Sequence, residues 1–167
     1  MNGRVEMHLA ELNVGRLLAP TDDPRVGEFM AALDRINGLG KRMPGFVWMM
    51  EGSGGPGTGN TDAKIVGDAQ FMSNLTVWET VETLEAFVWN TVHRTFYERR
   101  QEWFEVLGKM HFVMWWVPAG HKPTLAEALA KLDHLRSHGA SEAAFGWAWL
   151  AEAKLWRERS CGPMAAE

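Results

Sequence analysis

Apolar and polar positions along this chain change their period several times. Short stretches with apolar residues at both odd and even positions, bounded by Gly and Pro, are typical of strands. Apolar residues spaced three and four positions apart are typical of helices. Strands are expected over residues 5–14, 46–50, 71–78 and 111–117, and helices over residues 24–39, 81–104 and 125–135. The predicted order is therefore strand, helix, strand, strand, helix, strand, helix.

Helix ends are marked by residues with capping roles. Asp22 or Asp23 can cap the first helix, and Thr124 can cap the last helix, which Gly139 closes. The central helix either runs on without interruption or breaks and restarts near His93.

Two of the predicted strands have informative faces. Residues 46–50 (FVWMM) are wholly apolar, as expected for a strand that is covered on both faces. In strand 71–78, one face is mostly aliphatic, whereas the other carries Asn74, Thr76 and Trp78.

The order of elements predicts a ferredoxin-like βαββαβ domain of the α+β class, with a four-stranded antiparallel sheet and helices on one face. Because the strands carry apolar residues at both odd and even positions, both faces of the sheet are apolar. The face without helices would then be a large exposed apolar patch, which soluble monomers rarely keep. We therefore expect a homodimer whose two sheets pair as a dimeric α/β barrel around a ligand cavity. Residues 1–146 are expected to form this single domain, and residues 147–167 a partly helical C-terminal extension.

Composition narrows the class of protein. The chain has 167 residues, enough for one domain with a real core, and contains nine Trp and ten Met but one Tyr. Such a set suits a protein that encloses a flat apolar small molecule, and it suits a Trp-rich core equally well. The net charge is -4 and no basic stripe is present, so nucleic acid is not an expected partner.

The cysteine content and the hydropathy pattern indicate the cellular compartment in which the protein is expected. Cys161 is the only cysteine, so no intrachain disulfide can form and nothing argues for secretion. No apolar run approaches the roughly 20 residues of a membrane span, and the first residues lack the apolar segment of a signal peptide. The expectation is a cytoplasmic protein without a membrane partner.

A family resemblance is carried by three segments: HLAELNVG (8–15), NLTVWETVETLEAFVWNTVHRTFYERRQEWF (74–104) and WWVPAGHKPTLAEALAKL (115–132). Over roughly residues 5–146, the chain resembles an uncharacterised bacterial family, number 3291 of the domains of unknown function. That family is similar to the antibiotic-biosynthesis-monooxygenase-like dimeric α/β-barrel superfamily, which implies the fold. Superfamily relatives include cofactor-free quinol monooxygenases, haem-degrading enzymes, haem-dependent dehydratases and ligand binders, so the resemblance leaves the function open.

His93 is the principal candidate for chemistry. On a helix it lies one turn from Trp89 and one turn from Tyr97, with Phe96 and Arg100 alongside. A histidine there can move a proton, ligate a haem iron or hold a ligand oxygen. It can equally cap a backbone carbonyl at a helix break.

Asn74 is expected to act with His93 as a catalytic residue, because the polar face of its strand can line a cavity and orient a carbonyl or phenol. Trp78 on the same face, with Trp48 and Trp115, can add flat walls, although buried core tryptophans are the commoner outcome. The predicted ligand contacts are Trp48, Trp78, Trp89, Phe96, Tyr97, Arg100 and Trp115.

Other motifs do not predict further sites. His8, His93 and His111 can form a metal site only if their elements bring them together, so no metal is predicted. The glycine-rich segment GSGGPGTGN (52–60) lacks the ending of a P-loop and a following helix. It is interpreted as a mobile hairpin connection over the cavity mouth.

Three functions are compatible with these residues. The first is a cofactor-free monooxygenase acting on an aromatic, polyketide or quinol substrate, in which His93 and Asn74 form a phenolate or enolate that reacts with oxygen. The second is a haem-binding protein with His93 as the axial ligand. The third is a small-molecule carrier or structural dimer without catalysis.

Overall fold

The computed structural model describes residues 4–51, 67–106, 108–109 and 111–159 of the chain. At its centre is one antiparallel sheet with the strand order β2-β3-β1-β4. The strands are β1 (Met7–Arg16), β2 (Phe46–Met49), β3 (Phe71–Trp78) and β4 (Phe112–Pro118). This order and these connections are those of a ferredoxin-like α+β fold, which confirms the predicted fold class. The glycine-rich connection expected over the cavity mouth lies outside the described residues.

The helices flank this sheet. They are α1 (Gly27–Lys41), α3 (Val81–Asn90), α4 (His93–Glu98), α5 (Leu125–His138) and α6 (Lys154–Arg159), with 3-10 turns at Pro24–Val26, Arg100–Glu102 and Trp147–Trp149. Of the helices in the described ranges, none has both the length and the apolar character that a bilayer crossing requires.

Side-chain caps fix where three helical segments begin. Asp23 and Thr124 each accept a backbone N–H of the following turn, as predicted, ahead of the turn that leads into α1 and at the start of α5. At α3, Thr80 and Thr83 form a reciprocal capping box.

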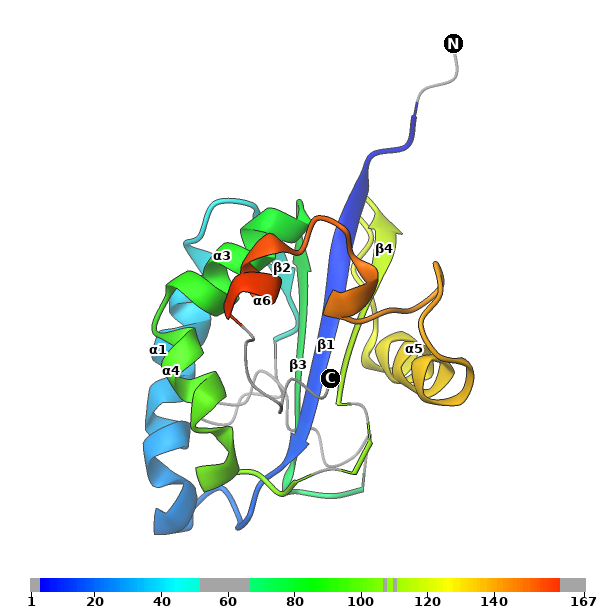
Figure 1. Ribbon diagram of the computed structural model, residues 1–167. Helices are drawn as coiled ribbons and strands as arrows, with labels where there is room; N and C mark the ends of the chain where they lie inside the picture. Colours follow the sequence, from blue (N-terminus) through cyan, green and yellow to red (C-terminus); the bar gives the residue numbers. More distant parts are fainter. Residues whose placement is uncertain (1–3, 52–66, 107, 110, 160–167) are drawn as a thin grey trace.

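Helices cover both faces of the sheet. Helices α1, α3 and α4 lie on one face, and α5 lies on the opposite face against β1 and β4 (Figure 1). On that side, Leu132 belongs to one buried cluster with Leu12, Val77 and Trp115, each at most 1% exposed. The expectation that helices cover a single face is therefore wrong, as is the premise that a second subunit must bury the other face. Homodimerisation itself stays a prediction, and it no longer follows from the pattern of the strands.

Strand β2 lies at the edge of the sheet, whereas the apolar run at 46–50 predicted a strand covered on both faces. A bulge interrupts its pairing with β3 between Phe46 and Trp48, and Val47 is 37% exposed. A short apolar run cannot by itself distinguish a central strand from an edge strand.

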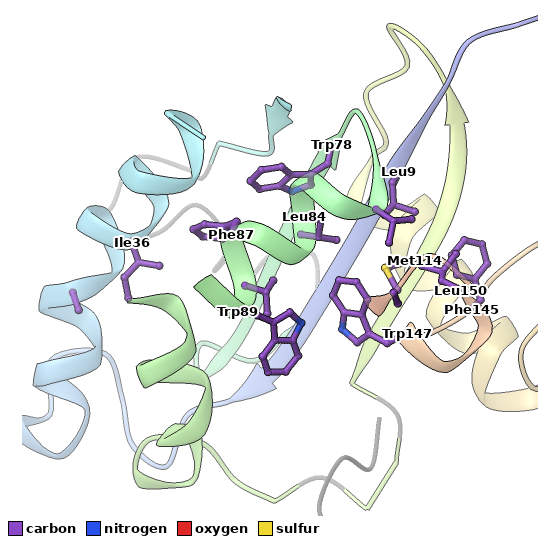
Figure 2. Packing of buried hydrophobic residues seen from close by; sticks show 14 residues of the cluster. Leu9, Ile36, Trp78, Leu84, Phe87, Trp89, Met114, Phe145, Trp147 and Leu150 are labelled. Atoms are coloured by element: carbon purple, nitrogen blue, oxygen red, sulfur yellow. The ribbon is translucent and has the colours of Figure 1, made fainter. Parts of the chain in front are cut away.

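The C-terminal segment packs back onto the sheet. Phe145 forms a single antiparallel bridge with Met114 on β4. Trp147 and Leu150 then join the buried cluster that holds Met114 and Trp89 (Figure 2). Residues 147–153 thus contribute to the core of the sheet, and independent folding of residues 1–146 stays a prediction.

A buried carboxylate on α3 holds α6 in place. Glu85 is 1% exposed, and its Oε1 accepts the backbone N–H of Trp156 at 2.9 Å. The backbone N–H groups of Lys154 and Leu155 also donate to this carboxylate. Glu85 therefore accepts from backbone donors at the start of α6, where helical N–H groups lack acceptors within the helix.

Replacing Glu85 by Ala should lower the free energy of unfolding by about 1–3 kcal/mol, because the donors of α6 lose their acceptor inside the protein. Urea unfolding followed by Trp fluorescence measures the change. Glu142→Ala, at an exposed position of the same C-terminal segment, is the matched control and should stay within about 0.5 kcal/mol of the wild type. An equal loss of unfolding free energy in Glu85→Ala and Glu142→Ala would contradict the assigned role of Glu85.

Candidate functional site

A cavity of about 660 Å³ lies between the sheet and the helices α1 and α4. Its volume is within the range of small-molecule sites. The walls are largely apolar and include Leu33 and Ile36 from α1, Met72 from β3 and Phe96 from α4. The cavity thus lies inside one chain, on the face opposite α5, whereas the sequence had predicted a cavity between two paired sheets.

A helix break at Thr91 places His93 at this cavity. Thr91 has extended backbone angles (φ -123°, ψ -178°), which end α3. Its hydroxyl donates to the carbonyl of Phe87 at 2.6 Å and accepts the backbone N–H of His93 at 3.2 Å. One residue therefore closes α3 and sets the start of α4, which corresponds to the alternative of a broken helix.

The imidazole of His93 lies in an apolar environment. Its ring centroid is 4.9 Å from that of Phe87, and its buried Nδ1 has no hydrogen-bond partner among the described residues. Desolvation lowers the pKa of His93 to about 4, against an opposing hydrogen bond with the backbone of Val88. His93 is therefore neutral at physiological pH, the form that can accept a proton or ligate a metal.

Asn74 lines the same cavity from the centre of the sheet. It lies on β3 directly opposite Asn13 of β1, and its Nδ2 donates to Oδ1 of Asn37 on α1 at 3.3 Å. Its buried Oδ1 has no partner among the described residues. Asn74 and His93 thus each present an unpaired polar atom, and the structure brings the two predicted catalytic residues to one cavity.

Three predicted ligand contacts also line this cavity: Phe96, Tyr97 and Arg100. The Arg100 guanidinium lies 4.4 Å from the centroid of the Tyr97 ring and donates to the Tyr97 carbonyl at 2.9 Å. This contact holds a positive charge beside an aromatic wall.

Four predicted ligand contacts lie elsewhere. Trp78 and Trp89 are 1% and 4% exposed in the core between the sheet and α3. Trp48 and Trp115 lie on the face covered by α5, where the Trp115 indole donates to Glu127 at 3.2 Å. Alternation along a strand does not reveal which sheet face holds a cavity, which is why Trp48 and Trp115 were included. Trp78 and Trp89 lie on the correct side of the sheet but pack into the core instead of the cavity wall.

The sequence did not single out Glu11, which lines a smaller recess of about 80 Å³ together with Thr76 from the predicted polar face of strand 71–78. Asn74 and His93 line both this recess and the main cavity. Glu11 is 7% exposed on β1, and its Oε1 accepts the hydroxyl of Thr76 at 2.6 Å. Burial raises the pKa of Glu11 to about 8, although the Thr76 hydrogen bond opposes the shift. The available signal was a carboxylate between the apolar residues Ala10 and Leu12 in the first predicted strand.

The three histidines considered as a metal site, His8, His93 and His111, do not converge on one site. Alternation along β1 places His8 on the opposite sheet face from Glu11 and Asn13, whereas His93 and His111 line the recess. Across the part of the chain that the structure describes, no group of three or more His, Cys, Asp and Glu side chains could hold a metal ion.

These features define an α+β protein of the ferredoxin-like type with a largely apolar cavity inside the chain. The chain belongs to the family described as Domain of unknown function (DUF3291), which matches residues 8–161. The match confirms the family resemblance and extends it through the C-terminal segment.

Two solved structures are similar to this chain. The crystal structure of PA3566 from Pseudomonas aeruginosa is 12% identical, with a TM-score of 0.47, and the match covers 71% of this chain and 100% of that protein. A protein from Nitrosomonas europaea named as a candidate antibiotic biosynthesis monooxygenase is 11% identical, with a TM-score of 0.43, and the match covers 74% of this chain and 100% of that protein. A comparison with curated proteins gave no match.

The raised pKa of Glu11 predicts a particular pH dependence of stability. A carboxyl group with a higher pKa in the folded chain stabilises the fold below its ordinary pKa of 4.5, and this contribution is lost as the pH rises through about 8. His93 acts in the opposite direction, because its lowered pKa costs stability only as the pH falls from 6.5 through about 4. Between about pH 6.5 and pH 8, a comparison of the wild type with a Glu11 variant therefore isolates Glu11, because the buried Glu85, whose pKa is also raised by desolvation, is common to both proteins.

Across that window, the wild type should lose up to about 2 kcal/mol of unfolding free energy relative to Glu11→Gln, which has no proton to lose. Urea unfolding at several pH values measures the difference. If the free energies of unfolding of the two proteins changed in parallel with pH, Glu11 would already be ionised at pH 6.5 and the prediction would be wrong.

Proposed function

We propose that the chain binds a flat, largely apolar small molecule between the sheet and the helices α1 and α4. The proposal is carried by the two buried polar atoms without partners among the described residues, Asn74 Oδ1 and His93 Nδ1, in the wall of one apolar cavity. Buried polar atoms are costly unless they are hydrogen-bonded. A hydroxyl on the ligand can donate to either atom, so a phenol or enol is the group that this site suits.

The proposed reaction is oxygenation without a cofactor. Neutral His93 takes the proton of a phenol or enol, and the apolar walls keep the resulting anion out of water. An electron-rich anion of this kind can reduce molecular oxygen directly. With anthrone as the substrate, one oxygen atom enters the ring system as the second carbonyl of anthraquinone, and the other leaves as water with the two hydrogens removed.

His93→Ala and Asn74→Ala should each weaken the binding of anthrone about tenfold, because each removes one hydrogen bond made inside an apolar site. His93→Ala should also abolish oxygen uptake, because this variant lacks the imidazole proposed as the base. Quenching of Trp fluorescence measures binding, and an oxygen electrode measures turnover with anthrones and hydroquinones. His138→Ala, at an exposed position on α5, is the matched histidine control.

The outcomes separate three functions. Binding with oxygen uptake that depends on His93 supports the monooxygenase. Binding without uptake supports a small-molecule carrier that lacks catalysis. Wild-type affinity in both His93→Ala and Asn74→Ala would contradict the site itself.

Haem is the second candidate ligand, because His93 offers an unpaired ring nitrogen at the cavity wall and is neutral at physiological pH. If His93 is the axial ligand, haemin added to the protein should shift its Soret band, and the shift should be absent in His93→Ala. An identical shift in that variant would exclude His93 as the iron ligand.

A further inference from the structure

The recess beside the main cavity contains a buried carboxylic acid whose hydrogen bonds have a defined direction. The indole Nε1 of Trp78 lies 2.9 Å from Oγ1 of Thr76, and that Oγ1 lies 2.6 Å from Oε1 of Glu11. An indole nitrogen can only donate, so Thr76 accepts from Trp78, and the hydroxyl of Thr76 donates to Oε1 of Glu11. With Oε1 engaged as an acceptor, a proton carried by Glu11 resides on its other oxygen, Oε2.

The surroundings of Glu11 favour the protonated acid. No lysine or arginine is among the described residues that line this recess. The other titratable side chains lining it are His93 and Tyr97 from α4 and His111 just before β4, while Glu85 on α3 is engaged at the start of α6. A carboxylate without a cation is strongly disfavoured at 7% exposure, and burial accordingly raises the pKa of Glu11 to about 8.

We propose that Glu11 is a ligand contact whose Oε2 donates a hydrogen bond to a carbonyl oxygen of a molecule that reaches from the main cavity into the recess, past Asn74 and His93, which line both. The inference rests on the proposed function and narrows its substrate class to uncharged, flat ring systems that carry a ketone or quinone carbonyl. A carboxylate of the ligand is disfavoured at this position, because no lysine or arginine is among the described residues of the recess that could pair with its buried charge. When His93 removes a proton from such a ligand, electron density moves to the carbonyl oxygen, where the Glu11 donor stabilises it.

Fluorenone and fluorene are suitable probes, since they are flat and of similar size and differ in one carbonyl group. The wild type should bind fluorenone about tenfold more tightly than fluorene near pH 7, and this preference should disappear as the pH rises to about 9.5. Glu11→Gln should keep the preference at both pH values, because its amide N–H still donates. Glu11→Leu should bind both probes without preference, and Glu142→Gln is the control for a glutamate outside the cavity.

An infrared measurement tests the same inference without a ligand. The wild type should show the carbonyl stretch of a protonated carboxylic acid near pH 7, and this band should be absent from Glu11→Gln and should vanish from the wild type as the pH rises. The absence of the band at pH 7 would overturn the inference. Thermal melts establish that each variant is folded.

The failure of the inference and that of the proposed function are distinguishable. Binding of fluorenone and fluorene with equal affinity, or a preference that does not change with pH in the wild type, overturns the role of Glu11 and leaves the cavity as a binding site. If neither probe binds, both the proposed function and the inference are overturned.

Discussion

The sheet of this protein is covered on both faces by its own chain, and the rest of the structure depends on this constraint. Every side chain on its central strands must then be apolar or find a polar partner inside the protein. The face under α5 is built mainly from aliphatic side chains and Trp115, whose indole donates to Glu127. The face under α1, α3 and α4 instead carries Glu11, Asn74 and Thr76, and these polar groups line one recess.

A local break in a helix turns that polar face into a cavity with a histidine in its wall. Thr91 ends α3 with an extended backbone, and its hydroxyl accepts the backbone N–H of His93 at the start of α4. An uninterrupted helix would continue along the direction of α3. The break instead begins a new helix at His93 and carries Phe96, Tyr97 and Arg100 along the cavity wall. The site therefore combines a rigid polar sheet face with a short helix whose position is set by one threonine.

Local sequence signals predicted much of this fold, because caps and periodicity act over a few residues. The predicted strand at 71–78 matches β3, and Thr124 caps α5 as expected. The position of α5 was not predictable in the same way. The apolar stripe of a helix shows that it packs against something, but it does not show which face of a sheet it covers. That single ambiguity led to the expectation of a sheet-to-sheet dimer.

The candidate site was predictable to the extent that helical spacing groups residues on one face. His93, Phe96, Tyr97 and Arg100 were grouped by that spacing, and they lie together at the cavity. The same helical spacing also selected Trp89, and the polar strand face selected Trp78, but both lie in the core. Trp48 and Trp115 were chosen as flat walls, and large aromatic side chains lie more often in the core than along a cavity. Glu11 was missed because a buried carboxylate is recognisable only when its neighbours on the adjacent strands are known.

Methyl NMR during a titration with fluorenone tests most directly whether the ligand site lies inside one chain, on the face opposite α5. Ile36 on α1 and Met72 on β3 line the cavity, whereas Val77 and Val113 lie in the cluster beneath α5. Our account predicts that the methyl resonances of Ile36 and Met72 shift while those of Val77 and Val113 stay unchanged. Shifts confined to Val77 and Val113 would place the ligand on the other face and contradict it.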